Sequence, residues 1–282
     1  MALIGHIVLA VDDLGARSPF ARRRASRIDC TRGGAGAALS RPAFALGSRE
    51  SGQRQNPGED MSERSQIVLI WWSLIFMNVF GMAWMFLIGT LPLPPATMTA
   101  PEIAQFYLDH SLRIRLGAAV CSWTSAFTVP ICVVASVQMA RLEKGPPVWA
   151  VLQLIGGVFT SLFVVLPPLL WGIAAFSPDR PPEITRLVHE SANLIFATAT
   201  QYVVFQMVAI TVISLRQTAM RHSPFPRWFG FFTIWTILIT EVAVTGYLTR
   251  TGPFAWNGLF VFWIPLAIGS VWLIAMAVMM LR

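Results

Sequence analysis

Six long apolar runs constrain the fold of this chain more than any other feature. Each is about 21 to 29 residues long, and a helix needs roughly 20 apolar residues to cross the hydrocarbon core of a bilayer. With 55% apolar and only 12% charged residues, the chain could not hide this much apolar surface in water. We therefore expect an all-α polytopic membrane protein. Its six transmembrane helices are expected at residues 67–90, 116–140, 148–176, 194–215, 229–249 and 259–281.

The first 60 residues have a different composition. They contain nine Arg and six acidic residues, and their only apolar run is the short segment 4–11, so they offer nothing that could form a core. Acidic residues follow that run directly, which argues against a secretory signal. We expect residues 1–60 to be a disordered leader and residues 61–282 to be the six-helix transmembrane domain. Residues 58–60 would be encoded by a purine-rich stretch compatible with a ribosome-binding site, which favours Met61 as the true start.

Basic residues in the connecting loops predict the orientation. Seven lie on one side of the expected helices and five on the other, and short loops richer in Arg and Lys usually face the cytoplasm. We therefore expect a multi-pass protein of the bacterial inner membrane with both termini in the cytoplasm. Because the bases are scattered between apolar runs, the expected partner is the lipid bilayer and not nucleic acid. The seven are Arg64, Arg141, Lys144, Arg216, Arg221, Arg227 and Arg282, and the five are Arg113, Arg115, Arg180, Arg186 and Arg250.

A step of 81 residues recurs along the chain. The first, third and fifth expected helices begin at residues 67, 148 and 229, and the tripeptide Pro101-Glu102-Ile103 recurs as Pro182-Glu183-Ile184 at the same step. Each tripeptide is suited to open a short amphipathic helix, and Thr99 with Glu102 matches a capping box. This spacing raises the hypothesis that the fold consists of three tandem helical hairpins.

Glu241 is the only acidic residue inside the six expected helices. A carboxylate at such depth costs several kcal/mol unless it is protonated, paired or hydrated. At about 1.5 Å of rise per residue, Glu241 and Gln201 lie at similar depths, so we expect them to meet. With Thr198, Ser122 and Thr245 they would form a small polar cavity that binds a substrate. The alternative is that these groups only join packed helices, as polar side chains in membranes commonly do.

The histidines argue against a haem and offer only a weak metal site. A haem held by two histidines needs both within the helices, but His110 and His189 are expected in outer loops and His222 in an inner loop. Zinc could bind where the pairs Asp109-His110 and His189-Glu190 share one side, but these residues lack the close spacing of a metal motif. We therefore expect His110, His189 and Glu190 to be solvated loop residues, and we expect no cofactor.

The C-terminal third carries a distinctive pattern. It consists of Phe225-Pro226-Arg227-Trp228, then Thr251-Gly252-Pro253-Phe254-Ala255-Trp256-Asn257-Gly258, then Phe262-Trp263-Ile264-Pro265. This pattern resembles an uncharacterised family of bacterial six-span integral membrane proteins, and the likeness is clearest over the fifth and sixth expected helices. Residues 1–60 have no counterpart in that family pattern. The resemblance implies an architecture and a location, and no particular activity.

Three functions stay open on these grounds. The first expectation is a carrier or permease for a small hydrophobic or weakly acidic compound, supported by Glu241 and by prolines that bend helices. The first alternative is an accessory or assembly subunit of a membrane complex, or a homo-oligomer, which needs no binding site. The second is a membrane-embedded enzyme acting on a lipid-like substrate, but the sequence carries no catalytic motif and no second ionisable group among the helices. The prolines are Pro130, Pro167, Pro168 and Pro265.

Overall fold

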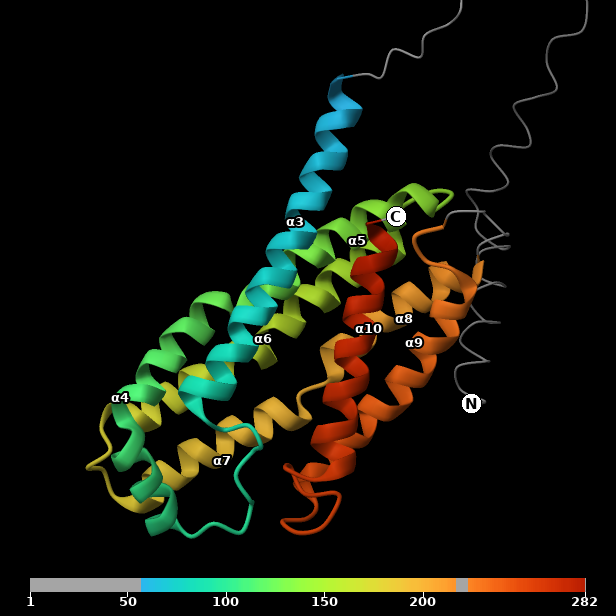
Figure 1. Ribbon diagram of the computed structural model, residues 1–282. Helices are drawn as coiled ribbons and strands as arrows, with labels where there is room; N and C mark the ends of the chain where they lie inside the picture. The colour runs from blue at the N-terminus through green and yellow to red at the C-terminus, as the bar shows by residue number, and fades with distance from the viewer. Residues whose placement is uncertain (1–56, 217–222, 282) are drawn as a thin grey trace, which may run out of the picture. The chain divides into compact units, whose positions relative to one another are not determined.

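The computed structural model describes residues 57–216 and 223–281, with side chains from residue 63 onward, and contains no strand in these ranges (Figure 1). Six helical segments of this part of the chain are long and apolar enough to cross a membrane. They confirm the predicted all-α polytopic fold. The six spans are Glu63–Ile88, Ala100–Leu142, Val148–Phe176, Pro182–Arg216, Arg227–Tyr247 and Leu259–Met280.

Part of what the sequence predicts lies outside the described residues. This applies to residues 1–56, and therefore to most of the expected leader. It also applies to Arg221, His222 and Arg282. Helix α3 begins at Pro57, before the proposed start at Met61.

Most spans change their helical geometry along their length. Of the six described spans, only the third, α6, is one uninterrupted α-helix. The fourth leaves helical form altogether at residues 199–200. The bounds along the six spans are α3 Pro57–Met82 with the π-helix η1 Ala83–Ile88; α4 Ala100–Thr124, the 3-10 turn η2 Ser125–Phe127 and α5 Thr128–Leu142; α6 Val148–Phe176; α7 Pro182–Thr198 and α8 Gln201–Arg216; α9 Arg227–Thr240 and the 3-10 helix η3 Glu241–Tyr247; and the π-helix η4 Leu259–Trp263 with α10 Ile264–Met280.

The second and fourth spans begin earlier than predicted. Helix α4 begins at Ala100 and α7 at Pro182, so the two amphipathic segments run directly into the membrane helices. The sequence between residues 102 and 116, and that between 183 and 198, holds no Gly or Pro that would end a helix. His189 is a helical residue of α7, and His110 lies within α4 at a kink where its backbone leaves helical angles (φ −122°, ψ 15°). The predicted placement of both in loops is wrong.

The predicted capping box at the start of α4 is confirmed. The Glu102 carboxylate accepts the Thr99 backbone N–H at 2.7 Å and the Thr99 hydroxyl at 2.8 Å. We expect Glu102→Ala to weaken this helix start by about 1 kcal/mol, because the Thr99 N–H loses its partner. Amide hydrogen exchange at residues 100–104 should then be several-fold faster. Glu183→Ala is the matched control, since Glu183 also directly follows a proline at the start of its helix, α7, but no side-chain cap forms there. Equal effects of the two changes would contradict the prediction.

Helix α6 lies at the centre of the packing and contacts α4, α5, α7 and α8. Two adjacent glycines allow two of these approaches. A Cβ on Gly156 would lie 2.7 Å from the backbone nitrogen of Gln206 on α8, and one on Gly157 would overlap the sulfur of Cys132 on α5. Close approach over small residues is the usual way in which membrane helices gain packing contacts. These two positions therefore fix the distances of α5 and α8 from α6.

One end of the bundle, here called the cap end, is formed by the connections 89–99, 177–181 and 248–258. Two of them are joined where the Trp256 indole N–H donates to the carbonyl of Pro94 at 2.8 Å. Beneath the cap end lies an aromatic cluster in which Trp84 stacks on Trp171, with ring centroids 6.5 Å apart, and meets Phe196 edge-on. The first two connections are followed by the α-helices α4 and α7, whereas the third is followed by the π-helix η4. The triple hairpin stays a prediction, and its third member differs in this respect.

Candidate functional site

Glu241 is the first residue of η3, directly after the end of α9. Its side chain belongs to the exposed face of this span, which also carries Trp235 and Leu238. Successive spacings of three residues place these side chains on one helix face. The carboxylate therefore lies on the surface of the bundle and not in a sealed contact between helices.

The partner of Glu241 is Thr200. The Thr200 hydroxyl donates to Glu241 Oε1 at 3.4 Å, which is a long contact for an O–H donor. Thr200 lies in the interruption between α7 and α8, and Figure 1 shows the chain leaving helical form there. The Thr200 N–H turns back to the carbonyl of Thr198 at 2.9 Å, and the Val203 N–H bonds to the carbonyl of Thr200 at 3.1 Å. Two interruptions of α-helix, one in the fourth span and one in the fifth, thus meet at Glu241.

The other residues of the predicted cavity occupy different positions. The Gln201 amide nitrogen donates to the Thr198 carbonyl at 3.2 Å, so this exposed side chain is beside the interruption but does not pair with Glu241. The Thr198 hydroxyl bonds to Leu194 O at 2.6 Å and the Thr245 hydroxyl to Val242 O at 2.8 Å, each on its own helix. These bonds leave the two hydroxyl hydrogens committed to local backbone.

Ser122 is not brought to this site. It lies on α4, which packs against α3, α6 and α7, whereas η3 packs against α7, α9 and η4. The predicted five-residue cavity is therefore replaced by a smaller polar group at the surface, formed by Glu241, Thr200 and Gln201.

One helix end acts on the charge of Glu241. Helix α8 begins at Gln201, so its positive N-terminal end lies beside Thr200 and favours a negative charge there. Helix α9 continues at Glu241 directly into the 3-10 helix η3, so no free helix C-terminus opposes this charge. A movement of α8 relative to α9 would therefore change the interaction energy of the carboxylate.

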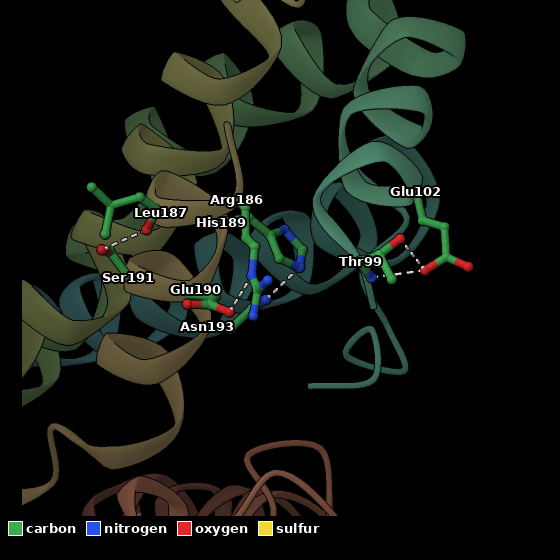
Figure 2. Close-up of polar contacts among 8 residues, drawn as sticks. All are labelled: Thr99, Glu102, Arg186, Leu187, His189, Glu190, Ser191 and Asn193. Atoms are coloured by element: carbon green, nitrogen blue, oxygen red, sulfur yellow. Dashed lines mark hydrogen bonds and ion pairs between the residues drawn. The ribbon is translucent and has the colours of Figure 1, made fainter. Parts of the chain in front are cut away.

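A second polar group, which sequence reasoning missed, lies near the cap end. His189 is 1% exposed and both of its ring nitrogens are engaged. Nδ1 lies 2.9 Å from the Tyr107 hydroxyl, and Nε2 lies 2.8 Å from the Asn193 amide nitrogen. The Asn193 oxygen in turn accepts the Trp171 indole N–H at 3.3 Å. Figure 2 shows His189 and Asn193 turned toward each other on α7.

The direction of this chain of hydrogen bonds is set by Trp171. An indole N–H can only donate, so the Asn193 oxygen faces Trp171 and its amide N–H faces His189 Nε2. Nε2 is then an acceptor, which makes His189 a neutral ring that donates from Nδ1 to Tyr107. The network joins α4, α6 and α7 in a buried place. The signal in the sequence was the spacing of four residues between His189 and Asn193, which puts both on one helix face.

The weak metal candidates do not converge. The His110 Nδ1 atom lies 3.0 Å from the carbonyl of Phe106, and Glu190 pairs with Arg186 at 2.8 Å while its neighbour His189 points to Asn193 (Figure 2). Within residues 57–216 and 223–281 no three side chains of the metal-binding types gather. The arrangement of His110, His189 and Glu190 therefore offers no shared coordination site.

The fold and the site define a six-span α-helical membrane protein with an acidic residue at a helix interruption. Comparisons with known protein families, with curated proteins and with solved structures found no match. The resemblance of the C-terminal third to a bacterial six-span family stays a prediction.

Proposed function

We propose that this protein is a carrier in the bacterial inner membrane, with both termini in the cytoplasm, for a small hydrophobic or weakly acidic compound. The observation that carries the proposal is the meeting of two interrupted helices at Glu241. Membrane carriers place substrate and ion sites where discontinuous helices expose backbone groups and helix ends. An acidic residue inside a membrane span is also a functional-site hypothesis in its own right.

Glu241 is the proposed proton-binding group. The N-terminal end of α8 lies close to it and favours its negative charge. Relative movement of the fourth and fifth spans would then couple protonation to conformation, which a proton-linked carrier needs. The exposed side chains of Gln201 and Tyr202 beside it offer one polar and one aromatic contact to a ligand that arrives from the lipid.

The test is proton-driven uptake into vesicles that contain the purified full-length protein. Radiolabelled benzoate, phenylacetate and octanoate serve as probes at pH 8, where they are almost wholly ionised, with protein-free vesicles as the background. We expect uptake of at least one probe above background and a loss of roughly tenfold or more in Glu241→Gln, because the amide cannot exchange a proton. Glu241→Asp should retain part of the activity. The matched control is Glu183→Gln, which changes another exposed acid, at the cap end, and should leave uptake unchanged. The proposal would be contradicted if no probe were taken up, or if Glu241→Gln took up as much as wild type.

A second candidate function is an accessory subunit of a membrane complex. It is favoured by the exposure of Glu241 and Gln201 on a face that otherwise carries Trp235 and Phe205. Ionisable residues within membranes almost always face protein or water, so such a face suits cover by another subunit. Recovery of a stoichiometric membrane partner from mild detergent, lost in Glu241→Gln, would favour this function over the carrier.

A further inference from the structure

An apolar hollow lies between the first span and α4. Its volume is about 420 Å³, and it extends from Asn78 on α3 to Leu87 on η1, with Val120 of α4 on its far wall. Asn78 is its only polar lining residue, and its amide nitrogen donates to the carbonyl of Leu74 on the same helix at 2.8 Å. A lining of this kind suits a hydrocarbon chain and offers little to a polar ligand.

The length of the hollow matches one leaflet of a bilayer. Asn78 and Leu87 are nine residues apart along one helical span, at most about 14 Å at the rise of an α-helix. The hydrocarbon core of a bilayer is about 30 Å thick, so one leaflet accounts for about 15 Å. An acyl chain of a membrane lipid would therefore fill the hollow along its length.

A free guanidinium lies at one end of the hollow. Gly89 follows Leu87 by two residues, and Arg113 Nη2 lies 2.9 Å from the position that a Cβ on Gly89 would occupy. Arg113 is exposed, and no ion pair or hydrogen bond involves its side chain within the described residues. The acid one turn before it, Asp109, instead accepts a bond from Gln105 at 2.7 Å. An unpaired arginine at the end of an acyl-sized hollow is placed to bind a phosphate group.

We infer that this surface binds one anionic phospholipid, with an acyl chain in the hollow beside Val79 and Val120 and the headgroup phosphate on Arg113. Both features are needed for the assignment. The hollow selects a hydrocarbon chain, and the guanidinium selects a net negative headgroup. The site lies on the first two spans and is independent of Glu241, so it does not rest on the proposed carrier function.

The test is lipid retention by the full-length protein in detergent, measured by native mass spectrometry. Palmitoyl-oleoyl phosphatidylglycerol and the corresponding phosphatidylcholine are titrated in parallel. We expect wild type to retain one phosphatidylglycerol with about tenfold preference over phosphatidylcholine. Arg113→Gln should remove that preference, whereas Arg250→Gln, a change to another exposed arginine at the cap end, should leave it intact. An unchanged preference in Arg113→Gln would overturn the inference.

Further variants separate the acyl chain from the headgroup and from other occupants. Val79 lines the hollow and is 38% exposed, so Val79→Phe should fill the hollow without disturbing the core and should lower retention of both lipids several-fold. Full retention in Val79→Phe, or displacement of phosphatidylglycerol by millimolar inorganic phosphate alone, would overturn the acyl-chain assignment. Rapid disulfide dimerisation of Val79→Cys in native membranes would also overturn it, because the hollow would then be an interface between two copies.

Discussion

Gly156→Ala is expected to destabilise the folded bundle by about 2–3 kcal/mol, at the upper end of the usual range for overpacking. The new Cβ would lie 2.7 Å from the backbone nitrogen of Gln206 and 3.0 Å from the carbonyl oxygen of Tyr202. Both are backbone atoms of α8, so relief requires the whole helix to move away from α6. The free energy of unfolding can be measured by titrating sodium dodecyl sulfate into mixed micelles and following helix content.

Two matched glycine changes give the scale of this effect. Gly269→Ala on α10 should be neutral or slightly stabilising, because no atom lies within 4 Å of the new Cβ and alanine favours helix more than glycine does. Gly157→Ala should be destabilising through the sulfur of Cys132, and the double variant Gly157→Ala, Cys132→Ala should recover part of that loss. If Gly156→Ala proves as stable as Gly269→Ala, the close approach of α6 and α8 is not as the structure shows.

The six spans could be predicted from the sequence because length and apolarity decide them. The helix starts at Ala100 and Pro182 could not be placed as well, because an amphipathic helix that runs into a membrane helix shows no boundary in composition. The same Pro-Glu-Ile segments that mark these starts were visible, and the capping box at Thr99 was predicted correctly. What failed was the assumption that each short amphipathic segment ends before the membrane helix begins.

The geometry around Glu241 could be predicted only in part. Its depth and its proximity to the start of α8 follow from counting residues, but its partner does not. The interruption at Ala199 and Thr200 contains no Gly or Pro, so the local sequence does not predict it. It forms where Thr198 packs closely on Gly246 of η3: a Cβ at Gly246 would lie 3.2 Å from the Thr198 methyl carbon. The interruption breaks the regular rotation of side chains around the helix, and so Thr200 takes the place expected for Gln201.

The polar network at His189 depends on contacts between residues far apart in sequence. Tyr107 and His189 are separated by 82 positions, and Trp171 comes from a third helix. A single sequence shows the residue types but not which helices bring them together. The burial of this network also explains why the polar composition at the start of α7 was misleading, since buried polar side chains form hydrogen bonds with each other and not with water.

Asn193→Leu is expected to destabilise the protein by about 3 kcal/mol. Leucine has a similar size but no polar atoms, so the change leaves both the Trp171 indole N–H and His189 Nε2 without a partner in a buried place. Each unsatisfied buried group costs about 1–3 kcal/mol. Tyr107→Phe should lower the stability by less, about 1–2 kcal/mol, because it removes only the hydroxyl that accepts the Nδ1–H of His189. Asn78→Leu is the control, since Asn78 is exposed and bonds only to its own helix, and it should change stability little.

The double variant Tyr107→Phe, Asn193→Leu tests whether these bonds form one network. Because both residues bond to the same imidazole ring, the two losses should not add, and the double variant should be more stable than their sum predicts. The reason is that His189, once released from both partners, can rotate to another acceptor or admit water. Strict additivity in the same detergent titration would show that the two bonds act independently, and the directed chain from Trp171 through Asn193 and His189 to Tyr107 would then be wrong.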